Sequence, residues 1–69
     1  MTEDIRIKVG NTIANLREKK GLSQVKLAEL SGVGRAHIIR IEQGKYNVRI
    51  DILERIAKAL GSTITLQEE

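Results

Sequence analysis

Residues 23–44, SQVKLAELSGVGRAHIIRIEQG, have the pattern of two short helices joined by a glycine turn. Ser23 is a good N-cap for the first helix, over residues 24–31, because its hydroxyl can accept a hydrogen bond from a free backbone N–H. Gly32 follows this helix, and glycine readily adopts the positive φ that a tight turn requires. The second helix covers residues 35–43. This spacing predicts a helix-turn-helix, in which the second helix packs at a fixed angle on the first.

Two further helices flank this unit. Residues 2–20 predict one helix, whose apolar stripe is formed by Ile5, Val9, Ile13 and Leu16. Gly10 lies within this helix at a cost of about 1 kcal/mol, which a close helix crossing would explain. Residues 50–60 predict the last helix, whose stripe is formed by Leu53, Ile56, Ala57 and Leu60. A short helical turn near residues 46–49 is a further candidate.

The C-terminal tail follows a different pattern. Residues 63–67, TITLQ, alternate polar and apolar side chains and include β-branched residues, as is typical of a strand. The rest of the sequence predicts no strand that could pair with it. We therefore interpret residues 62–69 as a dimerisation tail, in which Ile64 and Leu66 pair with the same tail of a second subunit. A frayed terminus is the alternative.

Composition excludes several classes of protein. The 69 residues suffice for one small domain with an aliphatic core, because the chain has one Tyr and no Phe or Trp. Without Cys and with a single His, we expect no metal site and no cofactor. The usual nucleophile–base pairs are missing, so we expect no enzyme and no catalytic residue. Neither an apolar run of roughly 18 residues nor a signal peptide is found, so we expect a cytoplasmic protein without membrane contact.

Positive charge is concentrated in the middle of the chain. The whole chain carries +3, but residues 5–50 contain ten Lys and Arg against three Glu, a net charge of +7. A polyanion is the natural partner for such a segment. An ordinary solvated surface would explain the charge alone equally well, so the sequence motifs have to decide.

Four motifs occur in order along the chain: LREKKGLSQ (16–24), LAELSGV (27–33), IEQGKYN (41–47) and IAKALG (56–61). Together they resemble the phage repressor/Cro-type (XRE-type) helix-turn-helix family over roughly residues 9–61. The resemblance implies an all-α fold, a compact bundle of about five short helices like the lambda repressor DNA-binding domain, over residues 1–61. It also implies a homodimer that binds double-stranded DNA, with residues 35–43 as the recognition helix in the major groove.

The resemblance also assigns roles to individual positions. Arg17 and Glu42 match a family pair that forms a structural ion pair. Gln24 matches a residue that contacts the DNA backbone. The positions where the family touches phosphates after the third helix are Gln43, Lys45, Tyr46 and Asn47. The complete set of DNA-binding candidates is Ser23, Gln24, Gly34, Arg35, Ala36, His37, Arg40, Gln43, Lys45, Tyr46 and Asn47.

Side-chain chemistry is consistent with these roles. Arginine can donate two hydrogen bonds to guanine, so we expect guanine opposite Arg35, Arg40 or both; a phosphate contact is the alternative for each. Ala36 can touch a thymine methyl group. His37 can donate to a phosphate or a base, which would make binding pH-sensitive, or it has no specific role. Tyr46 is more often a packing residue than a base stacker.

The sequence departs from the family at several positions. Gly34 stands where a Ser-like N-cap is usual, which removes a side-chain contact to DNA. Val48 and Arg49 replace the usual Pro and Ser, so the last helix is poorly capped and Arg49 is unfavourable to the helix dipole. A phosphate contact is an alternative role for Arg49. Ile39 and Ile52 are large apolar residues at positions that tolerate polar ones, either on the surface or in a dimer interface.

We therefore expect a homodimeric, sequence-specific transcriptional regulator that binds an inverted-repeat operator. Repression is the commoner outcome in the family. The alternative is an antitoxin-type interaction protein that neutralises a partner toxin and regulates its own promoter. In that case the helical body would contact the toxin, because the tail is short. A DNA-binding domain cut from a longer regulator is a third interpretation.

Overall fold

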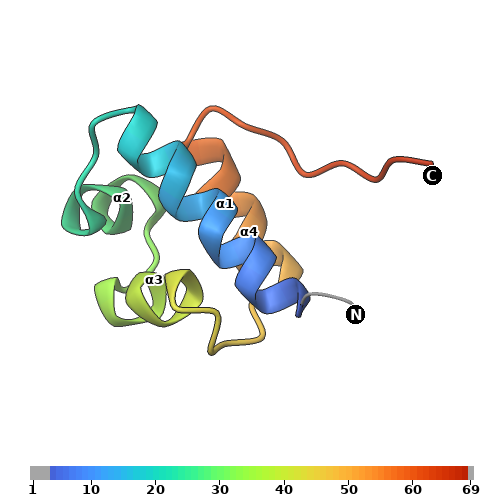
Figure 1. Ribbon diagram of the computed structural model, residues 1–69. Helices are drawn as coiled ribbons and strands as arrows, with labels where there is room; N and C mark the ends of the chain where they lie inside the picture. Colours follow the sequence, from blue (N-terminus) through green and yellow to red (C-terminus); the bar gives the residue numbers. More distant parts are fainter. Residues whose placement is uncertain (1–3, 69) are drawn as a thin grey trace.

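The computed structural model describes residues 4–68, and this part of the chain contains four helices (Figure 1): α1 (Ile5–Lys19), α2 (Gln24–Ser31), α3 (Arg35–Glu42) and α4 (Ile50–Ala59). The ends of α2 agree with the prediction, and α3 and α4 each end one residue earlier than predicted. The predicted start of the first helix, at Thr2, lies outside the described residues.

The expectation of about five helices was wrong for the described part of the chain. The candidate turn over residues 46–49 is an irregular loop. Gly44, at φ 73°, turns the chain out of α3. Arg49 is already extended, at φ −66° and ψ 146°, as the N-cap of α4. The few residues between them are too short a segment for a further hydrogen-bonded helix.

Local hydrogen bonds explain where α2 begins and how the turn to α3 is held. The Ser23 hydroxyl accepts a hydrogen bond from the backbone N–H of Lys26 at 3.0 Å. Gly32 ends α2 in the left-handed conformation, at φ 70°. The buried Ser31 hydroxyl donates to the Leu27 carbonyl at 2.7 Å and accepts from the Val33 N–H at 3.2 Å. These bonds span the turn and thereby set the direction in which α3 leaves it.

The core is aliphatic, as the composition predicts. α3 packs against both α1 and α2, and α2 also packs against α4. Burying one such aliphatic side chain contributes about 1.5–3 kcal/mol before the loss of chain entropy is counted. The buried core residues are Ile13, Leu27, Val33, Ile38, Ile41, Ile56 and Leu60.

Gly10 lies where α1 crosses α3. It is buried, and a Cβ atom at this position would overlap the backbone carbonyl oxygen of Ile41. Glycine is therefore required by the close approach of the two backbones rather than by its own conformation. This crossing holds α3 against the longest helix of the molecule.

The tail is not a strand in the described part of the chain. From Ser62 it runs along the helical body and then away from α2 and α3, without regular secondary structure (Figure 1). Ile64 and Leu66 are both exposed. The predicted strand was therefore wrong for this chain on its own, because a strand requires backbone hydrogen bonds to a neighbour and residues 4–68 contain no other strand. None of the helices in this part combines the length and the apolar character needed to cross a bilayer.

Candidate nucleic-acid interface

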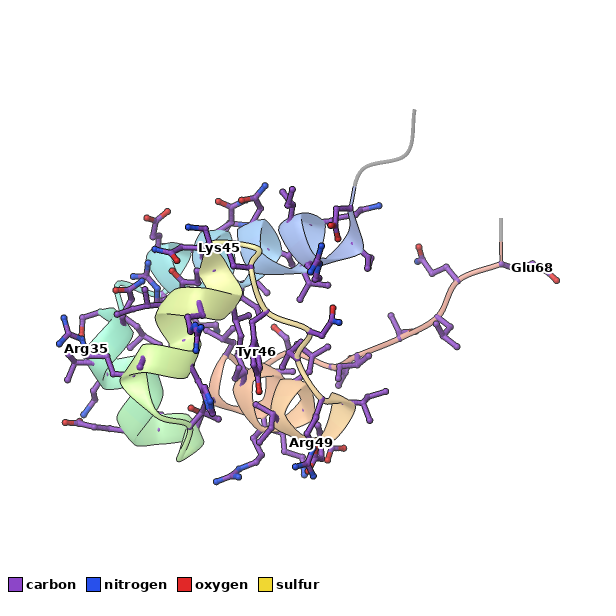
Figure 2. The ribbon with its side chains drawn as sticks, turned by 90° about the horizontal axis from the view of Figure 1, so that it is seen from below. Arg35, Lys45, Tyr46, Arg49 and Glu68 are labelled. Atoms are coloured by element: carbon purple, nitrogen blue, oxygen red, sulfur yellow. The ribbon has the colours of Figure 1, made fainter. Side chains whose placement is uncertain are left out.

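α3 has one buried side and one exposed side. Ile38 and Ile41 are buried in the core. The α3 residues expected to contact DNA are exposed: Arg35, Ala36, His37 and Arg40. Seen from below, α3 lies in front, and Arg35 extends from its N-terminal end while Lys45 follows its C-terminal end (Figure 2). The exposed side of α3 and the following loop therefore form a basic surface of the molecule.

The loop after α3 supplies further polar groups beside this surface. Gln43 is the C-cap of α3 and is exposed, as are Lys45 and Asn47. Arg49 lies further along the same loop and is paired, because its guanidinium donates to the Asp51 carboxylate at 3.0 Å. Arg49 is thus paired with Asp51 in the first turn of α4, and its side chain remains 75% exposed.

His37 and Tyr46 are stacked on each other. Their ring centroids lie 5.3 Å apart, and the ring planes are inclined by 22°. Tyr46 is half-buried and packs against the core, whereas His37 is exposed. Tyr46 therefore joins the loop to α3 and restricts the orientation of the imidazole. The sequence alone did not suggest this contact.

Arg17 and Glu42 form a bidentate ion pair between α1 and α3. Arg17 Nε donates to Glu42 Oε2 at 2.8 Å, and Arg17 Nη2 donates to Glu42 Oε1 at 3.0 Å. Arg17 Nη1 donates to the carbonyl of Leu22 at 2.8 Å. Hydrogen bonding to the Glu42 carboxylate raises the pKa of Arg17 above its ordinary value. The pair therefore ties the C-terminal end of α3 to α1 and to the loop before α2.

The start of α2 brings Ser23 and Gln24 to this network. The Ser23 hydroxyl is used as the helix cap, as described above. Gln24 Nε2 donates to Glu42 Oε1 at 3.1 Å. Gly34, the N-cap of α3, has no side chain with which to cap the helix. The structure thus connects the C-terminal end of α3 with α1 and the start of α2 in one network of hydrogen bonds.

One supporting residue was missed by the sequence interpretation. Arg55 of α4 donates from Nη2 to the carbonyl oxygen of Gly32 at 3.0 Å. This bond holds the turn of the helix-turn-helix against α4. Its partner is 23 residues away, and no local motif marks such a contact.

The comparisons with known proteins match this geometry. A model of the HTH_3 helix-turn-helix family matches residues 13–67. The chain belongs to this family.

Relatives of this helix-turn-helix protein include two regulators. The control protein C.BamHI of Bacillus amyloliquefaciens is 42% identical over 62 residues, which are 88% of this chain and 76% of the relative. The immunity repressor protein of Bacillus phage phi105 is 37% identical over 57 residues, which are 83% of this chain but only 40% of the repressor. Neither is named as an antitoxin, so the toxin-binding alternative is not favoured.

A solved structure shows the same fold bound to DNA. It contains the restriction-modification controller protein C.Esp1396I as a tetramer in complex with its natural 35 base-pair operator. It superimposes on this helix-turn-helix protein with a TM-score of 0.83 at 34% identity, covering 90% of this chain and 82% of the other. In this protein, α2 and α3 form the helix-turn-helix.

Proposed function

We propose that this protein is a transcriptional regulator that binds double-stranded DNA sequence-specifically, with residues 35–43 as its recognition helix. The observation that carries the proposal is the two-sided character of α3. Its apolar side is fully buried in the core, so the basic side is held outward in one orientation. An α-helix presented in this way fits the major groove of B-form DNA. A cytoplasmic location is part of this proposal.

Arg35, Ala36 and Arg40 are the proposed base-contacting residues. All three are exposed on α3. Each arginine can donate two parallel hydrogen bonds to O6 and N7 of guanine, and the Ala36 methyl group can contact thymine. We expect guanine within each half of the operator.

The remaining candidates bind the DNA backbone in this proposal. Lys45 contributes charge, and Gln43 and Asn47 contribute hydrogen bonds from exposed positions on the loop. His37, steadied by Tyr46, adds a donor beside them. At the other helix, Ser23, Gln24 and the free backbone N–H groups of α2 face the phosphates, and Gly34 allows close approach at the start of α3.

The proposed operator is an inverted repeat bound by a homodimer, with repression as the outcome. Two half-sites about one helical turn apart, roughly 34 Å, would accept the two recognition helices. Residues 1–61 are the DNA-binding domain in this proposal. Residues 62–69 contribute Ile64 and Leu66, which are exposed aliphatic side chains in the single chain, to the subunit contact.

The test is a binding selection from a randomised duplex library at about 150 mM salt, which suppresses loose attraction to phosphates. We expect enrichment of an inverted repeat with guanine in each half. The operator found in this way then serves for a matched pair of variants on α3 and its loop. A library that emerges without sequence enrichment would contradict the proposal.

Arg40→Ala and Lys45→Ala form that pair. Arg40→Ala should cost about 1–3 kcal/mol on the operator and relax base preference at one position per half-site. Lys45→Ala should weaken all sequences alike and reduce the salt slope by about one unit per half-site contact. A base-specific loss with Lys45→Ala, or an unchanged preference with Arg40→Ala, would reverse these assignments.

A further inference from the structure

A network of three side chains joins the first three helices at the edge of the proposed DNA surface. Glu42, at the end of α3, accepts hydrogen bonds from Arg17 of α1 and from Gln24 of α2. The side chains of Arg17 and Glu42 are only 13% and 8% exposed, whereas the first residue of α2, Gln24, is half-buried. The carboxylate is therefore shielded from water, and Gln24 lies at its outer side.

The chemistry of this contact allows one orientation of the Gln24 amide. An ionised carboxylate has only acceptor atoms, so the amide nitrogen of Gln24 must face Glu42 and the amide oxygen must point away from it. A flipped amide would place two acceptors against each other without a hydrogen. The amide nitrogen carries two hydrogens, and the 3.1 Å bond to Glu42 uses one of them. The second is left for another acceptor.

Arg17 removes the electrostatic drawback of this arrangement. A lone carboxylate close to DNA would repel the phosphates. Two hydrogen bonds from the Arg17 guanidinium, at 2.8 and 3.0 Å, compensate its charge and fix its rotamer. Glu42 can thus orient Gln24 without presenting a net negative charge to the nucleic acid.

We infer that Glu42 is a positioning residue for DNA binding, which holds the Gln24 amide so that its second N–H meets a phosphate oxygen. The inference rests on the proposed function and deepens it. Orienting a flexible side chain before binding removes an entropy cost that is worth roughly two- to tenfold in affinity. Arg17 supports the orientation through Glu42 and needs no contact with DNA of its own.

A double-mutant cycle tests the inference. The four proteins are the parent, Glu42→Gln, Gln24→Ala and the double variant. The probe is a duplex of arbitrary sequence and about 20 base pairs at about 50 mM salt, where backbone contacts are least screened. We expect Glu42→Gln to weaken binding roughly two- to tenfold when Gln24 is present and to change nothing when residue 24 is Ala.

Two outcomes of the cycle would overturn the inference. An equal loss in both backgrounds would mean that Glu42 only supports the fold. Tighter binding by Glu42→Gln would mean that the carboxylate acts as a repelling charge. If the parent protein binds neither this duplex nor the selected operator, the proposed function itself fails, so the two failures are distinguishable.

The second measurement uses the unchanged protein, because removing one partner of a buried ion pair can unfold a domain of this size. Side-chain amide signals in NMR report the hydrogens of Gln24 directly, and the exposed Gln43 and Gln67 are matched controls. We expect one Gln24 hydrogen to exchange slowly with water, and the other to shift when the duplex is added. Exchange of both hydrogens as fast as in Gln43 and Gln67 would reject the orientation by Glu42.

Discussion

The helix-turn-helix and the opposite end of the molecule differ in how far their apolar side chains are buried by the chain itself. Around α2 and α3, the inward-facing apolar side chains are buried (Leu27, Ile38 and Ile41), although Val25 and Leu30 on the outer side of α2 are exposed. At the start of α4 and in the tail, Ile50 is 75% exposed and Leu66 is 98% exposed. An apolar hollow of about 320 Å³ lies between α1, α4 and the tail.

In the proposed function, this difference separates the surface that binds DNA from the surface that associates with a second subunit. The proposed recognition surface is positioned by three contacts of α3: with the core, through the Arg17–Glu42 ion pair and through the turn that Arg55 binds. The other end exposes aliphatic surface that contributes little to the stability of a single chain and would gain free energy by contact with a partner. Substitutions in the first region should therefore affect folding, and substitutions in the second should affect association.

The largest effect is expected for Gly10→Ala. The new methyl group would overlap the Ile41 carbonyl, which belongs to the backbone of α3 and cannot rotate away. We expect a loss of more than about 3 kcal/mol of unfolding free energy, measured by urea denaturation, since the helices must separate. Asn11→Ala, at the exposed neighbouring position of α1, is the control and should change stability by less than about 0.5 kcal/mol. Equal effects of the two would show that the crossing is not tight.

Two of the arginine–carboxylate pairs, one shielded and one exposed, give the next comparison. Arg17→Met leaves Glu42 unpaired in a shielded position, so we expect a loss of about 3 kcal/mol in thermal or urea unfolding. Arg49→Met breaks a pair whose side chains are 75% and 58% exposed, and it should cost less than about 1 kcal/mol. If Arg49→Met were as damaging as Arg17→Met, the contrast between the two ends of the molecule would be wrong.

A smaller effect on the single chain is expected from the tail. Replacing both Ile64 and Leu66 by Ser should change the unfolding free energy of the monomer by less than about 0.5 kcal/mol, because both are exposed. The dissociation constant of the dimer should rise about tenfold or more. Sedimentation at micromolar concentration measures the association, and Thr65→Ala is the control. An unchanged mass would exclude the tail from the subunit contact.

The smallest effect concerns acid at the start of α1. Hydrogen bonds from the side chain and backbone of Arg6 lower the pKa of Asp4 to about 2. Because this pKa lies below the ordinary value of 3.8, the stabilisation is present above about pH 4 and is lost as the pH falls toward 2. Asp4→Asn keeps a cap but removes the charge, so its melting temperature should lie slightly below that of the parent at neutral pH. The two should converge near pH 2, and a constant difference would contradict this origin.

Much of the fold could be predicted because its signals are local. Ser23 before α2 and Gly32 after it act on backbone groups within a few residues, so their sequence positions locate the ends of that helix. The tail shows the limit of local patterns. Its alternation favours a strand, but a strand exists only with a neighbour, and residues 4–68 of the single chain supply none for Ile64 and Leu66.

The sequence by itself determined the helix-turn-helix, its family and the basic side of α3, because periodicity, caps and charge are properties of neighbouring residues. Only the tertiary structure decided which groups meet: Gln24 with Glu42, and Arg55 with the carbonyl of Gly32. It also decided that the backbone of α1 at Gly10 approaches the backbone of α3 closely. These partners lie far apart along the chain. Their contacts depend on the crossing of packed helices, which no local pattern specifies.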